Sequence, residues 1–219
     1  MPKFNHFPMG MQKGYDISMK WRLIDITQET NHPFLNFFTL HYEVSDERGT
    51  RPYSYFIASR HEKDEILAKS HSYGHPDGIL LCLYRKKESG IEVLLTSQFR
   101  PAIGTYLTSF PAGLLDGDED EKSAASREAL EEVGAIIDNI EILAPASPTS
   151  SGLSDETVSV ALAEIVDEKE TELEDFEDIT YRYYPLEEIP SILQDKNRLV
   201  PINIRLTLLY LCERFKKSF

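Results

Sequence analysis

The sequence has little cysteine and lacks any long apolar run. Its two cysteines, Cys82 and Cys212, both lie in short apolar stretches, so we expect buried, reduced thiols rather than a disulfide. The longest apolar stretches, residues 79–84 and 206–212, are far shorter than a membrane-spanning helix, and residues 1–15 contain no apolar run typical of a signal peptide. We therefore expect a soluble cytoplasmic protein that does not bind membranes.

Basic residues are also scarce relative to acidic ones. The chain has 23 Lys and Arg against 37 Asp and Glu, which gives a net charge of -14 over 219 residues. Nucleic-acid backbones favour Lys and Arg, so a nucleic-acid partner is not expected. Acidity is nevertheless compatible with phosphate chemistry, because a divalent cation can bridge carboxylates to a phosphate. The question is then where the carboxylates lie.

The chain divides into two regions by its pattern of residues. Aromatic and β-branched runs at residues 37–44 and 53–57 flank a charged turn with Gly and predict a hairpin. A polar stretch over residues 60–78 is rich in turn residues, including Gly74 and Pro76, and favours a domain boundary. We expect a small N-terminal β region over residues 1–74 and a larger domain over residues 75–219. His71 and His75 are interpreted as loop residues, because Gly74 and Pro76 disfavour a helix there.

The larger domain alternates strands and helices. In chain order we expect strands over residues 79–84 and 91–96, a helix over 119–133, strands over 158–166 and 179–184, a short helix from 186, and a helix over 201–215. Residues Ile204, Leu208, Leu211 and Phe215 recur at helical spacing in the last of these. This order favours an α+β fold with the layers of an α/β/α sandwich.

The acidic residues concentrate in two segments, residues 113–134 and 164–178. Glu128, Glu131 and Glu132 are spaced i, i+3 and i+4, so their side chains share one face of the expected helix. Carboxylates that converge in this way suit Mg²⁺ or Mn²⁺. On spacing alone a solvated acidic helix face explains the same pattern, and both interpretations remain open.

A longer pattern separates the two interpretations. The fixed positions are Gly113, Glu119, Arg127, Glu128, Glu131, Glu132 and Gly134, with Ala129 and Ala135 at the aliphatic positions. This segment resembles the Nudix box, G-x5-E-x7-R-E-U-x-E-E-x-G-U, at every fixed position. The resemblance implies a Nudix fold and metal-dependent hydrolysis with Mg²⁺ or Mn²⁺ as cofactor. It implies that Glu128 and Glu132 are metal ligands and that Arg127 orients a neighbouring glutamate. Glu131 is then a further or water-mediated ligand. Glu119 resembles the family's outer acid or the ligand of a third metal ion or, equally well, is a favourable charge at the helix N-terminus.

The residues around the box resemble one subfamily. Gln98-Phe99-Arg100-Pro101-Ala102 and the run from Phe110 to Asp116 are similar to motifs of ADP-ribose and ADP-sugar pyrophosphatases. The similarity implies that the backbone carbonyl of Ala112 binds a metal and that Arg100 reaches the diphosphate or the terminal ribose, a role suited to a guanidinium. A structural salt bridge is the alternative role for Arg100. Ser109 stands where the subfamily often has Glu.

The same resemblance suggests a general base and a partner. Glu177 precedes the expected strand at 179–184 as the subfamily's loop glutamate does, and it is our first choice; Glu156, in a lengthened loop, is the second. The acids between 168 and 175 are interpreted as a solvated loop. In this subfamily a small β domain is exchanged within a homodimer and stacks the adenine, which points to Tyr53, with Phe34 or Phe37 as a second ring. Aromatic residues in a hairpin are also explained as core.

The resemblance implies an enzyme that hydrolyses a nucleoside diphosphate sugar, with ADP-ribose cleaved to AMP and ribose 5-phosphate as the leading hypothesis. Another nucleotide sugar, a dinucleoside polyphosphate or an oxidised nucleotide remains an alternative substrate. A third alternative is a Nudix-fold protein that senses ADP-ribose without cleaving it. The intact box and the acidic charge disfavour a sensor that binds DNA.

Overall fold

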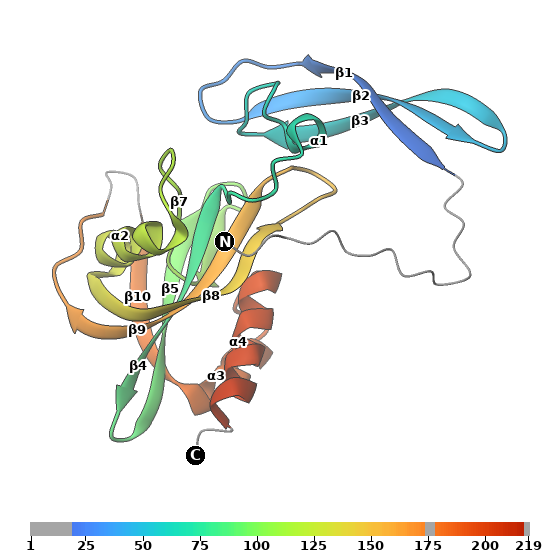
Figure 1. Ribbon diagram of the computed structural model, residues 1–219. Coiled ribbons are helices and arrows are strands. Elements are labelled where there is room, and N and C mark those ends of the chain that lie inside the picture. The colour runs from blue at the N-terminus through green and yellow to red at the C-terminus, as the bar shows by residue number, and fades with distance from the viewer. Residues whose placement is uncertain (1–18, 174–177, 217–219) are drawn as a thin grey trace. The chain divides into compact units, whose positions relative to one another are not determined.

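Two compact units make up the chain, and each is described separately. The computed structural model describes residues 19–173 and 178–216 (Figure 1). Unit 1 comprises residues 1–71 together with the short segment 152–155, and unit 2 comprises residues 72–151 and 156–219. Within the described residues, no helix is both long and apolar enough to cross a membrane.

Unit 1 is built on a three-stranded antiparallel sheet in the order β1-β2-β3. Its elements are β1 (Lys20–Gln28), β2 (Asn36–Asp46), β3 (Gly49–Ser59) and the single-turn helix α1 (Leu67–Ser70). The hairpin expected from the aromatic runs is confirmed by the register of β2 and β3, in which Tyr42 pairs with Tyr53. Strand β1 was not anticipated, because its apolar residues alternate with polar ones only weakly and its pairing is broken by a bulge. The core of the unit contains Ile26, Phe38, Leu40, Ile57 and Ile66.

Strand β3 gains a further partner from a distant part of the sequence. The amide of Ala58 donates to the carbonyl of Leu153 at 2.8 Å, and the hydroxyl of Tyr55 donates to the carbonyl of Gly152 at 3.1 Å. The amide of Leu67 donates to Asp155 at 3.1 Å. The segment from Gly152 to Asp155 is therefore held in unit 1 by one backbone–backbone hydrogen bond and by two that involve a side chain, although it lies far along the chain.

Unit 2 is built on a seven-stranded mixed sheet. Its strands are β4 (Gly78–Lys87), β5 (Gly90–Arg100), β6 (Thr105–Ser109), β7 (Ala112–Leu114), β8 (Ala135–Pro148), β9 (Thr157–Glu168) and β10 (Ile179–Pro185). The main order is β10-β5-β4-β9-β8, with β6 paired to β5 and β7 paired to β4. Strands β4 and β9 are parallel and central, which explains why both are apolar almost throughout.

Helices cover both faces of this sheet (Figure 1). Helix α2 (Glu121–Val133) packs on one face through a core that includes Leu81, Leu94 and Ala129. On the other face lie the short 3-10 helix η1 (Leu186–Glu188), α3 (Ile189–Gln194) and α4 (Ile202–Lys216), whose core includes Val93, Leu95 and Leu208. The expected α+β fold with α/β/α layers is thus confirmed.

Most of the expected elements of unit 2 are present. Helix α4 buries Ile204, Leu208, Leu211 and Phe215 as their spacing predicted. Both cysteines are buried and neither forms a disulfide, and burial raises the pKa of the Cys82 thiol well above its usual value. His71 and His75 lie outside regular secondary structure, as expected. Strands β6, β7 and β8 were not predicted, because β7 is very short and β8 alternates poorly and has several register shifts.

Candidate active site

Helix α2 begins at a well-formed cap. The side chain of Asp120 accepts hydrogen bonds from the amides of Lys122 at 3.0 Å and Ser123 at 3.2 Å, which satisfies two amides that have no partner within the helix. The pKa of Asp120 is lowered, mainly by a hydrogen bond from the Ser123 hydroxyl and then by the bonds from these two amides. The helix ends at Gly134, where φ is +64° and an added Cβ would lie 2.1 Å from the carbonyl oxygen of Lys169. The expected start at Glu119 is thus shifted by two residues.

Two glutamates lie on the buried side of α2. The helix faces the sheet with the short side chains of Ala124, Ala125 and Ala129, which let it approach closely. Glu128 and Glu132 are one helical turn apart and are only 8% and 4% exposed. A carboxylate this deeply buried needs compensating donors or a cation. The solvated acidic face is therefore ruled out for these two residues.

Arg127 joins the acidic residues of the box. Its guanidinium donates to Glu119 at 2.9 and 3.2 Å, to Glu128 at 2.6 Å and to Glu131 at 3.1 Å. It also donates to the carbonyl of Leu114 at 2.9 Å. The hydrogen bond to Glu119 contributes most to raising the pKa of Arg127, and the bonds to Glu128 and Glu131 raise it further. The hydrogen bond from Arg127 is also the main cause that lowers the pKa of Glu119. Arg127 thus fixes the carboxylates of three glutamates and the backbone carbonyl at the end of β7.

Strand β7 lies against the same face of the helix. The amide of Ala112 donates to Glu132 at 2.9 Å. Gly113 is needed because a Cβ at this position would lie 1.8 Å from the Glu128 carboxylate oxygen. The pairing of β7 with β4 through Leu80 and Ala112 holds this strand in place. Sequence positions twenty residues apart are therefore brought together around two buried carboxylates.

These residues line a pocket of about 450 Å³. Its walls are Ala112, Gly113, Leu114, Asp116, Arg127, Glu128, Glu131, Glu132 and Glu172. Glu172 is exposed and outside regular secondary structure, as expected of a solvated loop, and it also lines the pocket, where its amide donates to the Glu131 carbonyl at 2.9 Å. Glu168, which was also assigned to that loop, instead ends strand β9. Its carboxylate accepts hydrogen bonds from Arg85 at 2.9 Å and from Tyr183 at 2.7 Å. The positions of these two acids depend on contacts with residues distant in the sequence, so the local sequence could not distinguish them from the neighbouring acids.

The charge of the pocket suits a divalent cation. Its lining carries five carboxylates and one guanidinium. In the described residues, no three acidic, His or Cys side chains are arranged as a ready-made metal cage, and Arg127 lies among the carboxylates instead. The close packing of the Glu128 carboxylate against the backbone of Gly113 and the burial of Glu132 nevertheless fit a hard cation held by carboxylate and carbonyl oxygens. The donor set therefore favours Mg²⁺ or Mn²⁺ over softer metals.

Two other residues singled out from the sequence, Arg100 and Glu156, do not line this pocket. Arg100 is exposed at the end of β5, and its side chain has no ion-pair partner among the described residues. Glu156 precedes β9, where its carboxylate accepts from the Thr149 hydroxyl at 2.9 Å. Tyr53 belongs to unit 1, where it is 44% exposed and packs edge-on against Trp21. Glu177 lies outside the described residues.

Comparison with known proteins agrees with this geometry. An ADP-ribose pyrophosphatase of Saccharomyces cerevisiae is 40% identical over 75 residues, which is 33% of this chain and 32% of that protein. An ADP-sugar pyrophosphatase of Mus musculus is 40% identical over 73 residues, 33% of each chain. The alignments thus span about a third of these curated relatives.

A solved structure shares the fold. The crystal structure of an ADP compounds hydrolase superimposes with a TM-score of 0.66 at 16% sequence identity, covering 91% of this chain and 96% of that one. The model of the NUDIX domain matches residues 74–204, which is more than half of the chain and includes every residue of the pocket. The chain therefore belongs to the Nudix domain family.

Proposed function

We propose that the protein is a metal-dependent Nudix pyrophosphohydrolase that cleaves ADP-ribose to AMP and ribose 5-phosphate. The observation that carries the proposal is the pair of buried carboxylates, Glu128 and Glu132, held by Arg127 and by the amide of Ala112. Similarity to ADP-ribose and ADP-sugar pyrophosphatases supports the substrate class. The charge supports a metal requirement, because a pocket with five carboxylates repels a diphosphate unless cations are bound.

The cofactor is proposed to be Mg²⁺ or Mn²⁺. The oxygen ligands would be the carboxylates of Glu128 and Glu132 and the carbonyl of Ala112, with Glu119 and Glu131 as outer acids. When bound, such ions neutralise the diphosphate and lower the pKa of water. Arg127 contributes by fixing the carboxylates before substrate arrives, so that little reorganisation is needed during the reaction.

The remaining roles concern substrate and proton. A water oxygen attacks one phosphorus, the bond from that phosphorus to the bridging oxygen breaks, and the proton of the water passes to a carboxylate base. Glu177 is proposed as that base, with Glu156 as the second choice. Arg100 is proposed to hold the diphosphate, since its guanidinium has no ion-pair partner among the described residues and can bind two phosphate oxygens at once. Tyr53 is proposed to stack on the base of the nucleotide, in a homodimer.

The test is a turnover assay with ADP-ribose and Mg²⁺. We expect equal amounts of AMP and ribose 5-phosphate, and we expect Glu132→Gln to reduce turnover by orders of magnitude. Glu88→Gln is the matched control, because Glu88 is exposed in the turn between β4 and β5 and has no role in the site. We also expect Mg²⁺ to raise the midpoint of thermal unfolding of the wild-type protein and to have no such effect on Glu132→Gln. Unchanged turnover in Glu132→Gln contradicts the metal assignment.

A second substrate class is favoured by one residue. Ser109 is 8% exposed in β6, where the resembling pyrophosphatases often carry Glu, so one contact expected with ADP-ribose is changed. The assay therefore includes other nucleotide sugars and a dinucleoside polyphosphate. If one of these compounds has a higher kcat/KM than ADP-ribose, the proposed reaction class stands and that compound becomes the proposed substrate.

A further inference from the structure

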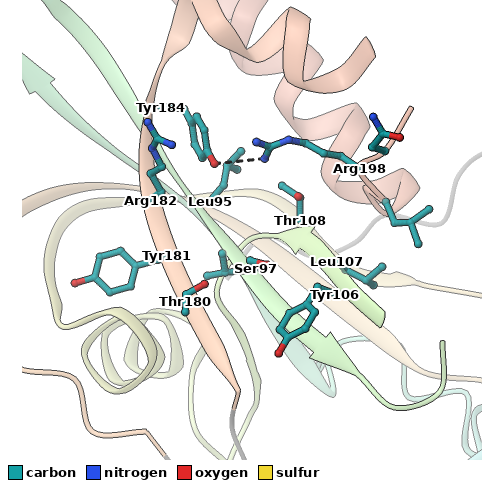
Figure 2. Close-up of a pocket in the computed structure, with 13 residues that line it drawn as sticks. Leu95, Ser97, Tyr106, Leu107, Thr108, Thr180, Tyr181, Arg182, Tyr184 and Arg198 are labelled. Atoms are coloured by element: carbon teal, nitrogen blue, oxygen red, sulfur yellow. Dashed lines mark hydrogen bonds between the residues drawn. The ribbon is translucent and has the colours of Figure 1, made fainter. Parts of the chain in front are cut away.

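A second pocket, of about 520 Å³, lies on the face of the sheet opposite helix α2 (Figure 2). Its floor is formed by β5, β6 and β10, where Leu95 belongs to the core beneath α3 and α4. Arg182 pairs with Leu95, and Thr180 and Thr108 both pair with Ser97, so these side chains share that face. None of these residues lines the carboxylate pocket. The second pocket is therefore separate from the proposed active site.

One wall of this pocket is the segment that precedes helix α4. The amide of Thr108 donates to the carbonyl of Leu199 at 2.9 Å, which ties the segment to β6. From it Arg198 reaches across to donate to the hydroxyl of Tyr184 at 3.3 Å, as the dashed line in Figure 2 shows. The volume falls within the range typical of small-molecule sites, and it exceeds what a single inorganic anion fills.

The charge of this pocket is opposite to that of the chain. Its thirteen lining residues include two arginines and no acid, although the chain carries a net charge of -14. The guanidinium carbons of Arg182 and Arg198 lie 5.3 and 5.5 Å from the centre of the Tyr184 ring. The Tyr184 ring lies between the two guanidinium groups, so each is a separate cationic group of the pocket (Figure 2).

The two arginines differ in how they are neutralised. Arg198 has a carboxylate neighbour in Asp195, at 3.5 Å. Arg182 lies over the Tyr184 ring and forms no ion pair with a carboxylate among the described residues. The pocket thus offers an exposed guanidinium for an oxyanion and, elsewhere on its lining, the hydroxyls of Thr108, Thr180 and Ser97 for a polyhydroxylated group.

We propose that this pocket binds a small sugar phosphate, with its phosphate on Arg182 and its sugar hydroxyls toward Thr108, Thr180 and Ser97. A fork of guanidinium donors suits the phosphate oxygens, and the hydroxyl side chains suit a sugar. The proposal is independent of the proposed function, since it involves neither the box residues nor a metal ion.

Calorimetric titration with ribose 5-phosphate in EDTA tests the proposal, because chelation removes the cations that binding in the acidic pocket requires. We expect one binding event for the wild-type protein. Arg182→Gln should weaken it by about tenfold or more, since a charge-assisted hydrogen bond is lost. Arg198→Gln should weaken it less, because Arg198 is already paired with Asp195. Lys87→Gln is the control for the change in charge, because Lys87 is exposed at the far end of β4.

Three comparisons make the result decisive. Circular dichroism should show that Arg182→Gln remains folded, since this side chain is exposed. Ribose and citrate test the contributions of the sugar and of a carboxylate anion. The proposal is overturned if wild-type protein does not bind ribose 5-phosphate, if Arg182→Gln and Lys87→Gln bind it equally, or if ribose or citrate binds as tightly. Failure of ADP-ribose turnover, by contrast, affects only the proposed function.

Discussion

Gly113 connects the backbone of β7 to the carboxylate of Glu128. Its hydrogen occupies a position where a methyl group would lie 1.8 Å from Glu128 Oε1 and 2.3 Å from Oε2, so a side chain and the carboxylate cannot both be present. Glu128 is 8% exposed and is also held by Arg127, which limits how far it can move. The glycine of the box is therefore a requirement of space at this residue, rather than of a positive φ.

Replacing Gly113 with alanine should displace the Glu128 carboxylate without unfolding the protein. We expect turnover to fall by about 100-fold, because a displacement of about 1 Å at a catalytic group has effects of this size. The stabilisation by Mg²⁺ in thermal denaturation should fall as well. Gly74→Ala is the matched control, because nothing lies within 4 Å of its added Cβ. Equal turnover in the two variants would show that Glu128 tolerates the methyl group.

Residues of the box could be predicted from the sequence, whereas others in the same pocket could not. Fixed spacing within one helix decides that Glu128 and Glu132 share a face, and burial confirmed that this face is not solvated. Glu172 could not be distinguished from its acidic neighbours, because its place depends on the hydrogen bond from its amide to the carbonyl of Glu131. The role of Arg182 could not be predicted from the sequence either, since the residues that line the second pocket come from four separate segments.

Helix α2 presents its carboxylates correctly only if its first turn is fixed. Asp120 caps the helix, and Glu119 just before it is bound to Arg127 in the second turn. The cap and this ion pair together fix where the helix starts. Helical periodicity predicted the extent of α2 well, and also that of α4, because both helices bury one continuous stripe. Strands β6, β7 and β8 were missed because their pairing, rather than their own pattern, defines them.

Asp120→Ala should lower the midpoint of thermal unfolding by a few degrees near neutral pH, with little change in turnover. The pKa of Asp120 is lowered in the folded protein, so the carboxylate stabilises the fold above its unfolded value of about 3.8 and this contribution is lost as the pH falls below it. The difference between the variant and the wild-type protein should therefore shrink in acid. Asp118→Ala, at an exposed position outside the helix, should show no such difference at any pH.

At the scale of the whole molecule, both units expose apolar side chains. Unit 1 leaves Trp21, Phe37, Tyr53 and Phe56 exposed, with Phe37 and Phe56 stacked at 6.1 Å. Helix α4 exposes Ile202, Leu206, Leu209 and Tyr210, which recur at helical spacing on the side away from its core. Exposed apolar groups that gather in this way mark interaction surfaces. They support the proposed homodimer, and they distinguish two surfaces that it could use.

Sedimentation equilibrium should give twice the chain mass of 25.1 kDa for the wild-type protein. We expect Phe56→Ser to shift this equilibrium toward the single chain, because the N-terminal β region is the proposed dimerisation element. Leu206→Ser, which removes a comparably exposed side chain from α4, should not. A single-chain mass for the wild-type protein would contradict the homodimer, and the opposite order of the two variants would move the interface to α4.

The segment from Gly152 to Asp155 makes unit 1 discontinuous in the gene as well as in the chain. A fragment that begins at residue 72 would keep these four residues but lose β3, to which the Leu153 carbonyl and the Gly152 carbonyl are bonded. The reverse fragment, residues 1–71, would lack an edge partner for β3. Recombination or truncation at a single junction therefore cannot separate the two units cleanly. An exchange of the N-terminal unit between relatives has to carry two coding segments together.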